Sequence, residues 1–77
     1  MQSMTSYSMD NLFAQLGLPN TDDEIDQFVE SHQLADDLPL YDAPFWSEGQ
    51  RQFIRQSLRL DSMWTEVVDE LSMMLHS

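Results

Sequence analysis

The side chains that could do chemistry in this 77-residue chain are mostly acidic. Fourteen Asp and Glu stand against three Arg and two His, and there is no Lys or Cys. The densest acidic stretch, TDDEIDQ at 21–27, lacks the alternating ligands, the central Gly and the terminal Glu of a calcium loop. Without Cys, a thiolate nucleophile and a Cys-based metal site are excluded. We therefore expect no metal site and no cofactor.

The two histidines are the remaining candidates for acid–base catalysis. His32 falls at the end of an apolar helical stripe, where the helix dipole favours a charged imidazole and carbonyl groups can accept its protons. His76 stands next to the last residue given and is expected to fray. Ser31 precedes His32, but neighbouring side chains diverge on a helix and form no nucleophile–base pair. We expect no catalytic residue and no enzyme.

All three basic side chains lie in one short segment. Arg51, Arg55 and Arg59 are spaced by four and would line one side of a helix. Guanidinium groups in such a row can bind a carboxylate-rich or phosphorylated ligand. The alternative, which we favour, is pairing within or between subunits, for example between Glu48 and Arg51, with each exposed pair contributing about 0–1 kcal/mol. The three Arg are kept as candidate partner-binding residues.

Phe45 and Trp46 stand side by side just before this basic segment. Pro44 holds the preceding residue extended, and Trp46 falls where a hydrophobic staple would contact Arg51. Neighbouring extended side chains point in opposite directions, so one ring should enter the core while the other stays partly open. We favour a structural plug and keep the pair as candidate partner-binding residues, because aromatic pairs are typical of interface hot spots.

Four segments with helical spacing position these residues, at about 9–16, 22–32, 48–60 and 62–76. Residues typical of N-caps precede them: Ser8, Thr21 with Glu24, Ser47 with Gln50, and Asp61 or Ser62. Gly17 ends the first helix, and Leu18 is placed to close back on Phe13. In the fourth, four residues are expected to be buried: Trp64, Val67, Val68 and Leu71.

The expected fold is all-α, a compact bundle of four short helices in a single domain, 1–77. Residues 1–7 are expected to be flexible. Residues 34–46 are expected to form an ordered, packed loop with prolines between the second and third helices, because four apolar residues can anchor it. These anchors are Leu34, Leu38, Leu40 and Tyr41.

The charge pattern restricts the partners. The net charge is −11, and residues 1–50 hold ten acids and no base. Such a surface repels phosphates, so we expect no direct binding to nucleic acid or to a membrane. No apolar run approaches the roughly 20 residues that span a bilayer, and the first residues do not form a signal peptide. We expect a cytoplasmic protein.

Four stretches in this order carry a resemblance to a known family: LFAQLGLP, the His32 that follows QFVES, DAPFW and WTEVVDEL. Together they resemble the small bacterial family catalogued as domain of unknown function 2789. The resemblance runs from about Met9 to Leu75. It implies a small bacterial helical protein and brings no activity, substrate or catalytic residue.

The leading interpretation is a non-enzymatic helical module that binds another protein and could form a homodimer. Met63, Met73 and Met74 flank the apolar stripe of the fourth helix and offer an adaptable apolar face. The alternative is an acidic mimic of nucleic acid that occupies the basic groove of a DNA- or RNA-binding protein. A module would expose an apolar patch, whereas a mimic would expose rows of acids and little apolar surface.

Overall fold

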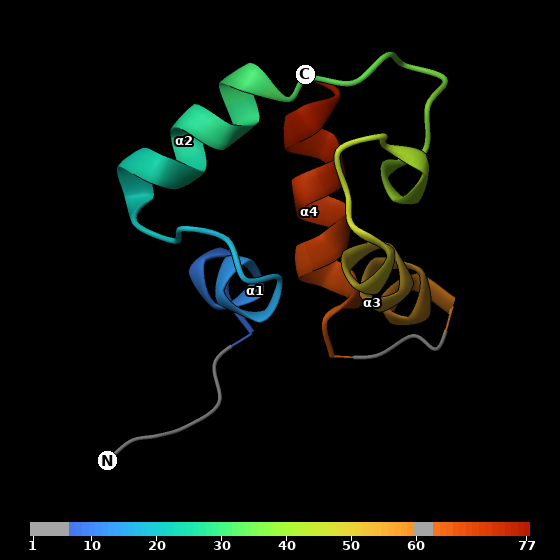
Figure 1. Ribbon diagram of the computed structural model, residues 1–77, viewed down its shortest axis with the longest axis horizontal. Helices are drawn as coiled ribbons and strands as arrows, with labels where there is room; N and C mark the ends of the chain where they lie inside the picture. Colours follow the sequence, from blue (N-terminus) through green and yellow to red (C-terminus); the bar gives the residue numbers. More distant parts are fainter. Residues whose placement is uncertain (1–6, 60–62) are drawn as a thin grey trace.

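The computed structural model describes residues 7–59 and 63–77, which form four α-helices, one short 3-10 helix and no strand (Figure 1). The helices are α1 (Met9–Gln15), α2 (Asp22–Ser31), α3 (Glu48–Arg59) and α4 (Thr65–Leu75), and the 3-10 helix η1 spans Leu40–Asp42. The expected all-α fold of four short helices is confirmed. The prediction of a flexible start concerns mostly residues 1–6, which lie outside the described residues.

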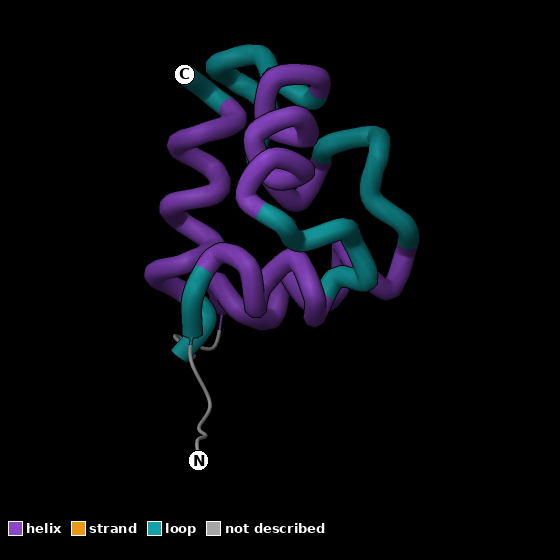
Figure 2. The backbone as a smooth tube through the Cα atoms, turned by 90° about the vertical axis from the view of Figure 1, so that its left-hand side faces the viewer, coloured by secondary structure: helices purple, strands orange, loops and turns teal. Residues whose placement is uncertain are grey.

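Helix α4 is the centre of the domain. It contacts α1, α2 and α3. In Figure 1, α4 runs vertically, while α1 and α3 are seen nearly end on. Figure 2, turned by 90°, likewise shows helices that cross rather than run parallel. Helices α3 and α4 therefore cross rather than run side by side. Burying each large apolar side chain in such a core contributes about 1.5–3 kcal/mol.

The buried face of α4 follows the expected spacing, with one exception at its start. Val67, Val68 and Leu71 are buried, as expected. Trp64 is only half-buried and stands at the N-cap, since the helix begins at Thr65 rather than near residue 62. The expectation that Trp64 is buried is therefore wrong. The proposed caps at 61 and 62 lie outside the described residues.

The end of α1 is a Schellman motif. Gly17 has a φ of 75°, in the left-handed region that favours glycine. Its N–H donates to the carbonyl of Ala14 at 3.0 Å, and the N–H of Leu18 donates to that of Phe13 at 2.9 Å. The predicted return of Leu18 onto Phe13 is thus a backbone hydrogen bond. At the other end, the Ser8 hydroxyl makes no cap bond, and it donates to the Asp10 carboxylate.

Both predicted capping boxes form. Thr21 and Glu24 exchange bonds at the start of α2. At the start of α3, the backbone N–H of Gln50 donates to the Ser47 hydroxyl at 3.2 Å, and the Ser47 N–H donates to the Gln50 side chain at 2.8 Å. The Gln50 amide also donates to the carbonyl of Leu16 at 2.8 Å, which ties the start of α3 to the end of α1.

The chain leaving α2 closes the end of α4. The N–H of Leu34 donates to the carbonyl of Leu75 at 2.7 Å, and the Gln33 amide donates to that of Met74 at 3.0 Å. These are carbonyls that a helix end leaves without an internal partner. The segment then runs to η1, where Leu40 is buried. Two parts of the chain about forty residues apart are thus joined by hydrogen bonds to the carbonyls at the end of α4.

Candidate functional site

The aromatic pair lies at the inner side of the loop before α3. Trp46 is only 5% exposed, and its Nε1–H donates to the carbonyl of Leu40 at 2.8 Å. Phe45 is half-buried, with its ring centroid 4.7 Å from that of Trp46. Phe28 of α2 contacts both, at 5.6 and 5.9 Å between centroids. The indole therefore closes the loop from inside, and the phenyl ring covers it.

These rings belong to a larger group, called here the aromatic cluster: Phe13, Phe28, His32, Phe45 and Trp46. Each pair in contact sits at a centroid distance of 4.0–5.9 Å, where aromatic pairs contribute about 0.5–1.5 kcal/mol beyond the area they bury. The cluster joins α1, α2 and the loop before α3. A gap opened at its centre would affect all three.

His32 is a structural member of this cluster. Its ring stacks on Phe28 at 4.0 Å, and its Nδ1 lies 2.8 Å from the Phe28 carbonyl oxygen. Because a carbonyl oxygen only accepts, Nδ1 carries a proton and cannot take one from Ser31. The Ser31 hydroxyl donates to the Gln27 carbonyl at 2.7 Å. The Ser31 hydroxyl also lies 3.1 Å from this Nδ1, so the expectation that the two side chains diverge is wrong. With a proton on Nδ1, the hydroxyl can only accept from the ring in this arrangement.

Arg51 turns toward the backbone of the loop. Its Nη2 donates to the carbonyl of Ala43 at 3.2 Å, and its buried Nε has no hydrogen-bond partner among the described residues. The expected ion pair with Glu48 does not form among the described residues, and the Glu48 carboxylate accepts from the Gln52 amide at 3.3 Å. Arg51 thus fixes the loop rather than facing a partner.

Arg55 and Arg59 remain exposed on the outer side of α3. They line a pocket of about 190 Å³ with Tyr41 and Leu58, called here the arginine pocket. A neighbouring hollow of about 220 Å³ is formed by the same two Arg with Gln52 and Gln56. The Arg55 guanidinium carbon lies 5.6 Å from the centre of the Tyr41 ring. Within the described ranges, none of the three Arg lies within 4.0 Å of a carboxylate oxygen.

The acids form a solvated surface. Every acidic side chain in residues 7–59 and 63–77 is exposed. A hydrogen bond from the Ser8 hydroxyl lowers the pKa of Asp10 below its ordinary value of 3.8. Over those same residues, no three Asp, Glu or His side chains come together in an arrangement that could hold a metal ion. The carboxylates contribute charge to the surface rather than a defined ligand set.

His76 joins the end of α4 to the loop after α2. Its Nε2 lies 2.7 Å from the carbonyl oxygen of Leu38 and its Nδ1 lies 2.6 Å from that of Ser72. These two carbonyls, Leu38 first, raise the pKa of His76 above 6.5. Burial opposes them, and the charge of Asp36 adds the smallest increase. Both ring nitrogens donate only when the ring is protonated. The expectation that His76 frays is wrong.

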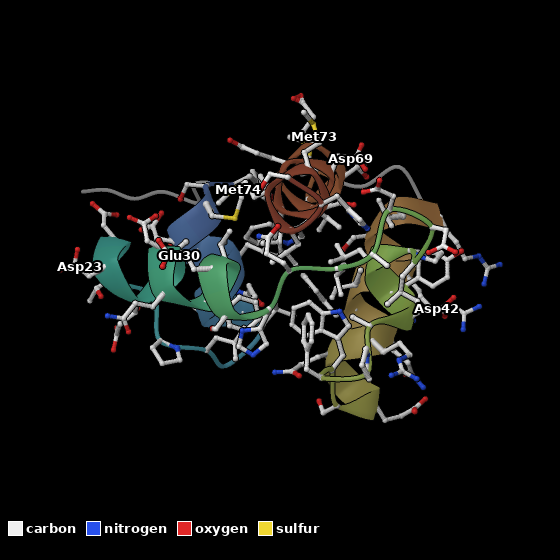
Figure 3. All side chains as sticks on the ribbon, turned by 90° about the horizontal axis from the view of Figure 1, so that it is seen from above. Asp23, Glu30, Asp42, Asp69, Met73 and Met74 are labelled. Atoms are coloured by element: carbon white, nitrogen blue, oxygen red, sulfur yellow. The ribbon has the colours of Figure 1, made fainter. Side chains whose placement is uncertain are left out.

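The outward face of α4 was not singled out by the sequence as a unit. Glu66, Asp69, Glu70 and Met73 share one side of the helix and are all exposed, with Met73 at 74%. In Figure 3, Asp69 and Met73 point away from the body while Met74 lies on the side facing α2. Their i, i+3, i+4, i+7 spacing was the available signal. None of the described helices is long and apolar enough to cross a membrane.

These features define a small acidic all-α domain, closed by an aromatic cluster and carrying a basic pocket on α3. The chain belongs to the family of proteins of unknown function DUF2789, whose family model matches residues 1–75. Its fold is similar to the solution NMR structure of protein CV0237 from Chromobacterium violaceum. The two are 39% identical, with a TM-score of 0.82 over 92% of this chain and 90% of that chain. No curated protein matches the chain significantly.

Proposed function

We propose that this protein is a non-enzymatic, cytoplasmic interaction module that binds a basic protein partner through the outward face of α4. The observation that carries the proposal is Met73, 74% exposed at the end of a row of three carboxylates. An exposed methionine alone is ordinary at a protein surface. Here it lies on the outward side of the helix whose other side forms the centre of the core.

The chemistry of this face fits a partner with an apolar hollow surrounded by Lys or Arg. The unbranched thioether of Met73 can adapt to an irregular hollow. Glu66, Asp69 and Glu70 would meet basic side chains at the rim, where complementary charge raises the association rate. A net charge of −11 strengthens the same attraction at longer range. The absence of Cys fits a reducing compartment.

Two alternatives are disfavoured by the same face. A homodimer built on it would press the carboxylates of two copies together, which like-charge repulsion opposes. A mimic of nucleic acid would keep little apolar surface exposed, whereas Met63 and Met73 are 69% and 74% exposed. The non-enzymatic part rests on the histidines, since His32 and His76 both face backbone carbonyls with Nδ1.

A photocrosslinking experiment tests the proposal. A photoreactive amino acid replaces Met73 in the native host, and a matched control replaces Ala14, which is exposed on α1. We expect adducts to a protein with a basic surface from position 73 only. Changing Glu66, Asp69 and Glu70 to Gln together should abolish them. Adducts of equal yield from both positions, or adducts unaffected by the Gln changes, contradict the proposal.

A binding measurement then separates the partner classes. With the captured protein purified, Met73→Ala should weaken its binding by about tenfold, as expected when a central interface side chain is truncated. Sedimentation of the isolated chain should give a monomer. A dimer that Met73→Asp dissociates would replace the basic partner with a second copy.

A further inference from the structure

Among the residues that the structure describes, Arg55 and Arg59 have no ion-pair partner, although the protein carries a large excess of acid. Fourteen carboxylates are available to three guanidinium groups, yet among the described residues no carboxylate lies within 4.0 Å of either side chain. Arg51, four residues earlier, is instead bonded to the backbone. The two outer Arg thus bring two positive charges to the arginine pocket.

The charge of this pair matches a dianion better than a carboxylate. Side chains at i and i+4 on a helix lie about 5–6 Å apart at Cβ, close enough for two guanidinium groups to reach one anion. A single carboxylate would neutralise one of them and leave the other unpaired. A phosphate monoester carries a charge of about −1.5 to −2 at pH 7 and three acceptor oxygens. Guanidinium forks bind such oxygens in pairs.

The size of the pocket indicates a group as large as one side chain. Its volume of about 190 Å³ is smaller than the roughly 300–1,000 Å³ of pockets that enclose small molecules or cofactors. Tyr41 and Leu58 supply apolar walls for a short carbon stem. Tyr41 also lies under the Arg55 guanidinium, which restricts the motion of that side chain.

We infer that the arginine pocket binds the phosphate group of a phosphorylated serine or threonine on a partner protein. Arg55 and Arg59 bind the phosphate oxygens, and Tyr41 with Leu58 contacts the stem. The site is separate from the outward face of α4 and does not depend on it. The distant acids of the chain oppose binding only weakly, because the Debye length is about 8 Å at physiological ionic strength.

An NMR titration tests this inference. The probes are one peptide in three forms, carrying phosphoserine, glutamate or serine at the same position, and free O-phosphoserine. We expect saturable shifts of the Arg55 and Arg59 side-chain signals with the phosphopeptide. Its affinity should exceed that of the glutamate peptide by at least about tenfold, since charge-assisted bonds to a dianion are stronger and more numerous. Free O-phosphoserine should bind more weakly than the phosphopeptide.

A matched pair of variants controls for net charge. Arg55→Gln/Arg59→Gln removes both guanidinium groups, whereas Gln15→Glu/Gln27→Glu lowers the net charge equally at exposed positions on α1 and α2. We expect only the first pair to weaken phosphopeptide binding, by about tenfold or more. The inference is overturned by unsaturable shifts, by equal losses in both pairs, or by a glutamate peptide that binds as tightly. Free O-phosphoserine as tight as the phosphopeptide would overturn the protein origin of the ligand.

A second pair of variants tests whether a charge near the arginine pocket affects phosphopeptide binding more than a distant charge. Asp42 follows Tyr41 directly and is the exposed last residue of η1, whereas Asp23 lies on α2 at the other end of the view (Figure 3). Asp42→Asn and Asp23→Asn raise the net charge by the same amount. Asp42→Asn should tighten binding more, because Coulomb interactions weaken with distance and are screened beyond the Debye length. Equal tightening by both would overturn a site at Tyr41, Arg55 and Arg59.

Discussion

The loop that leads into α3 and the outer side of α3 itself behave in opposite ways. On the inner side, Trp46 is 5% exposed and its polar atom is bonded. On the outer side, Arg55 and Arg59 are exposed beside an open pocket. Arg51 lies between these regions and bonds the carbonyl of Ala43. The three Arg are evenly spaced in the sequence, but tertiary contacts separate them: Arg51 is bonded to the loop, whereas Arg55 and Arg59 are exposed.

This difference separates residues that hold the fold from residues available for binding. A buried indole with a bonded N–H can be replaced only at the cost of a cavity and a lost bond. An exposed guanidinium without a charged partner contributes little to the free energy of unfolding. Mutations of the inner residues should therefore change the free energy of unfolding, whereas mutations of the outer residues should change ligand binding.

The largest effect is expected for Trp46→Ala. Removing the indole leaves a cavity in the aromatic cluster and an unpaired Leu40 carbonyl, so the free energy of unfolding should fall by about 3–5 kcal/mol. Trp46→Phe keeps a ring and loses the hydrogen bond, so it should cost about 1–3 kcal/mol. Urea unfolding followed by circular dichroism measures both. A Trp46→Ala variant as stable as wild type would remove the contrast between the two sides.

A smaller effect is expected for Trp64→Ala. Trp64 is half-buried at the N-cap of α4 and meets Tyr7 and Phe53 at centroid distances of 4.9 and 6.0 Å. Its truncation opens no enclosed cavity, so we expect a loss of about 1–3 kcal/mol. The same unfolding measurement applies. A loss equal to that of Trp46→Ala would mean that the half-buried Trp64 contributes as much to the free energy of unfolding as the buried Trp46.

Local sequence signals predicted the elements well because helix ends are decided by neighbouring residues. Both capping boxes and the Gly17 stop could be predicted, since each joins groups three to five residues apart. The failures come from contacts between distant segments. The bond of His76 to Leu38 spans 38 residues, and no helical period indicates it.

The candidate site was predicted only as a set of residues. The spacing of four placed Arg51, Arg55 and Arg59 on one side of a helix. It could not show that the Arg51 guanidinium would donate to the carbonyl of Ala43. Tyr41, which lines the pocket with the other two, was expected only as a loop anchor. Its position depends on how η1 packs against α3, which is decided by tertiary contacts. The signal for the α4 face was in the spacing of its exposed residues.

A pH-dependent effect is expected for His76→Gln. Because the folded pKa of His76 is raised, its stabilisation is complete below about pH 6.5 and is lost as the pH rises through the folded value. The variant should be less stable by about 1 kcal/mol near pH 6, and the gap should narrow toward about pH 9. Asp10 does not interfere, since its lowered pKa affects stability only as the pH falls toward and below 3.8.

Unfolding curves at several pH values, with the His76 titration followed by NMR, check this expectation. Repulsion among the acids also weakens as the pH falls, but it is present in both proteins and cancels in the difference. A gap that is constant with pH would show that His76 acts by packing alone. A gap that widens with rising pH would reverse the sign of the predicted pKa change.

The smallest effect is expected for Arg59→Gln, which completes the contrast along α3. Arg59 is exposed and has no ion pair among the described residues, so its loss should change the free energy of unfolding by less than about 0.5 kcal/mol. Arg55→Gln removes the contact with Tyr41 and should cost about 0.5–1 kcal/mol.

Arg51→Gln removes the hydrogen bond to the Ala43 carbonyl from a partly buried site and should cost about 1–3 kcal/mol. All three remove one charge, so the change in long-range repulsion is similar and the ranking reports local contacts. Equal losses in the three variants would mean that charge alone matters, and Arg55 and Arg59 could then not be separated from Arg51 as binding residues.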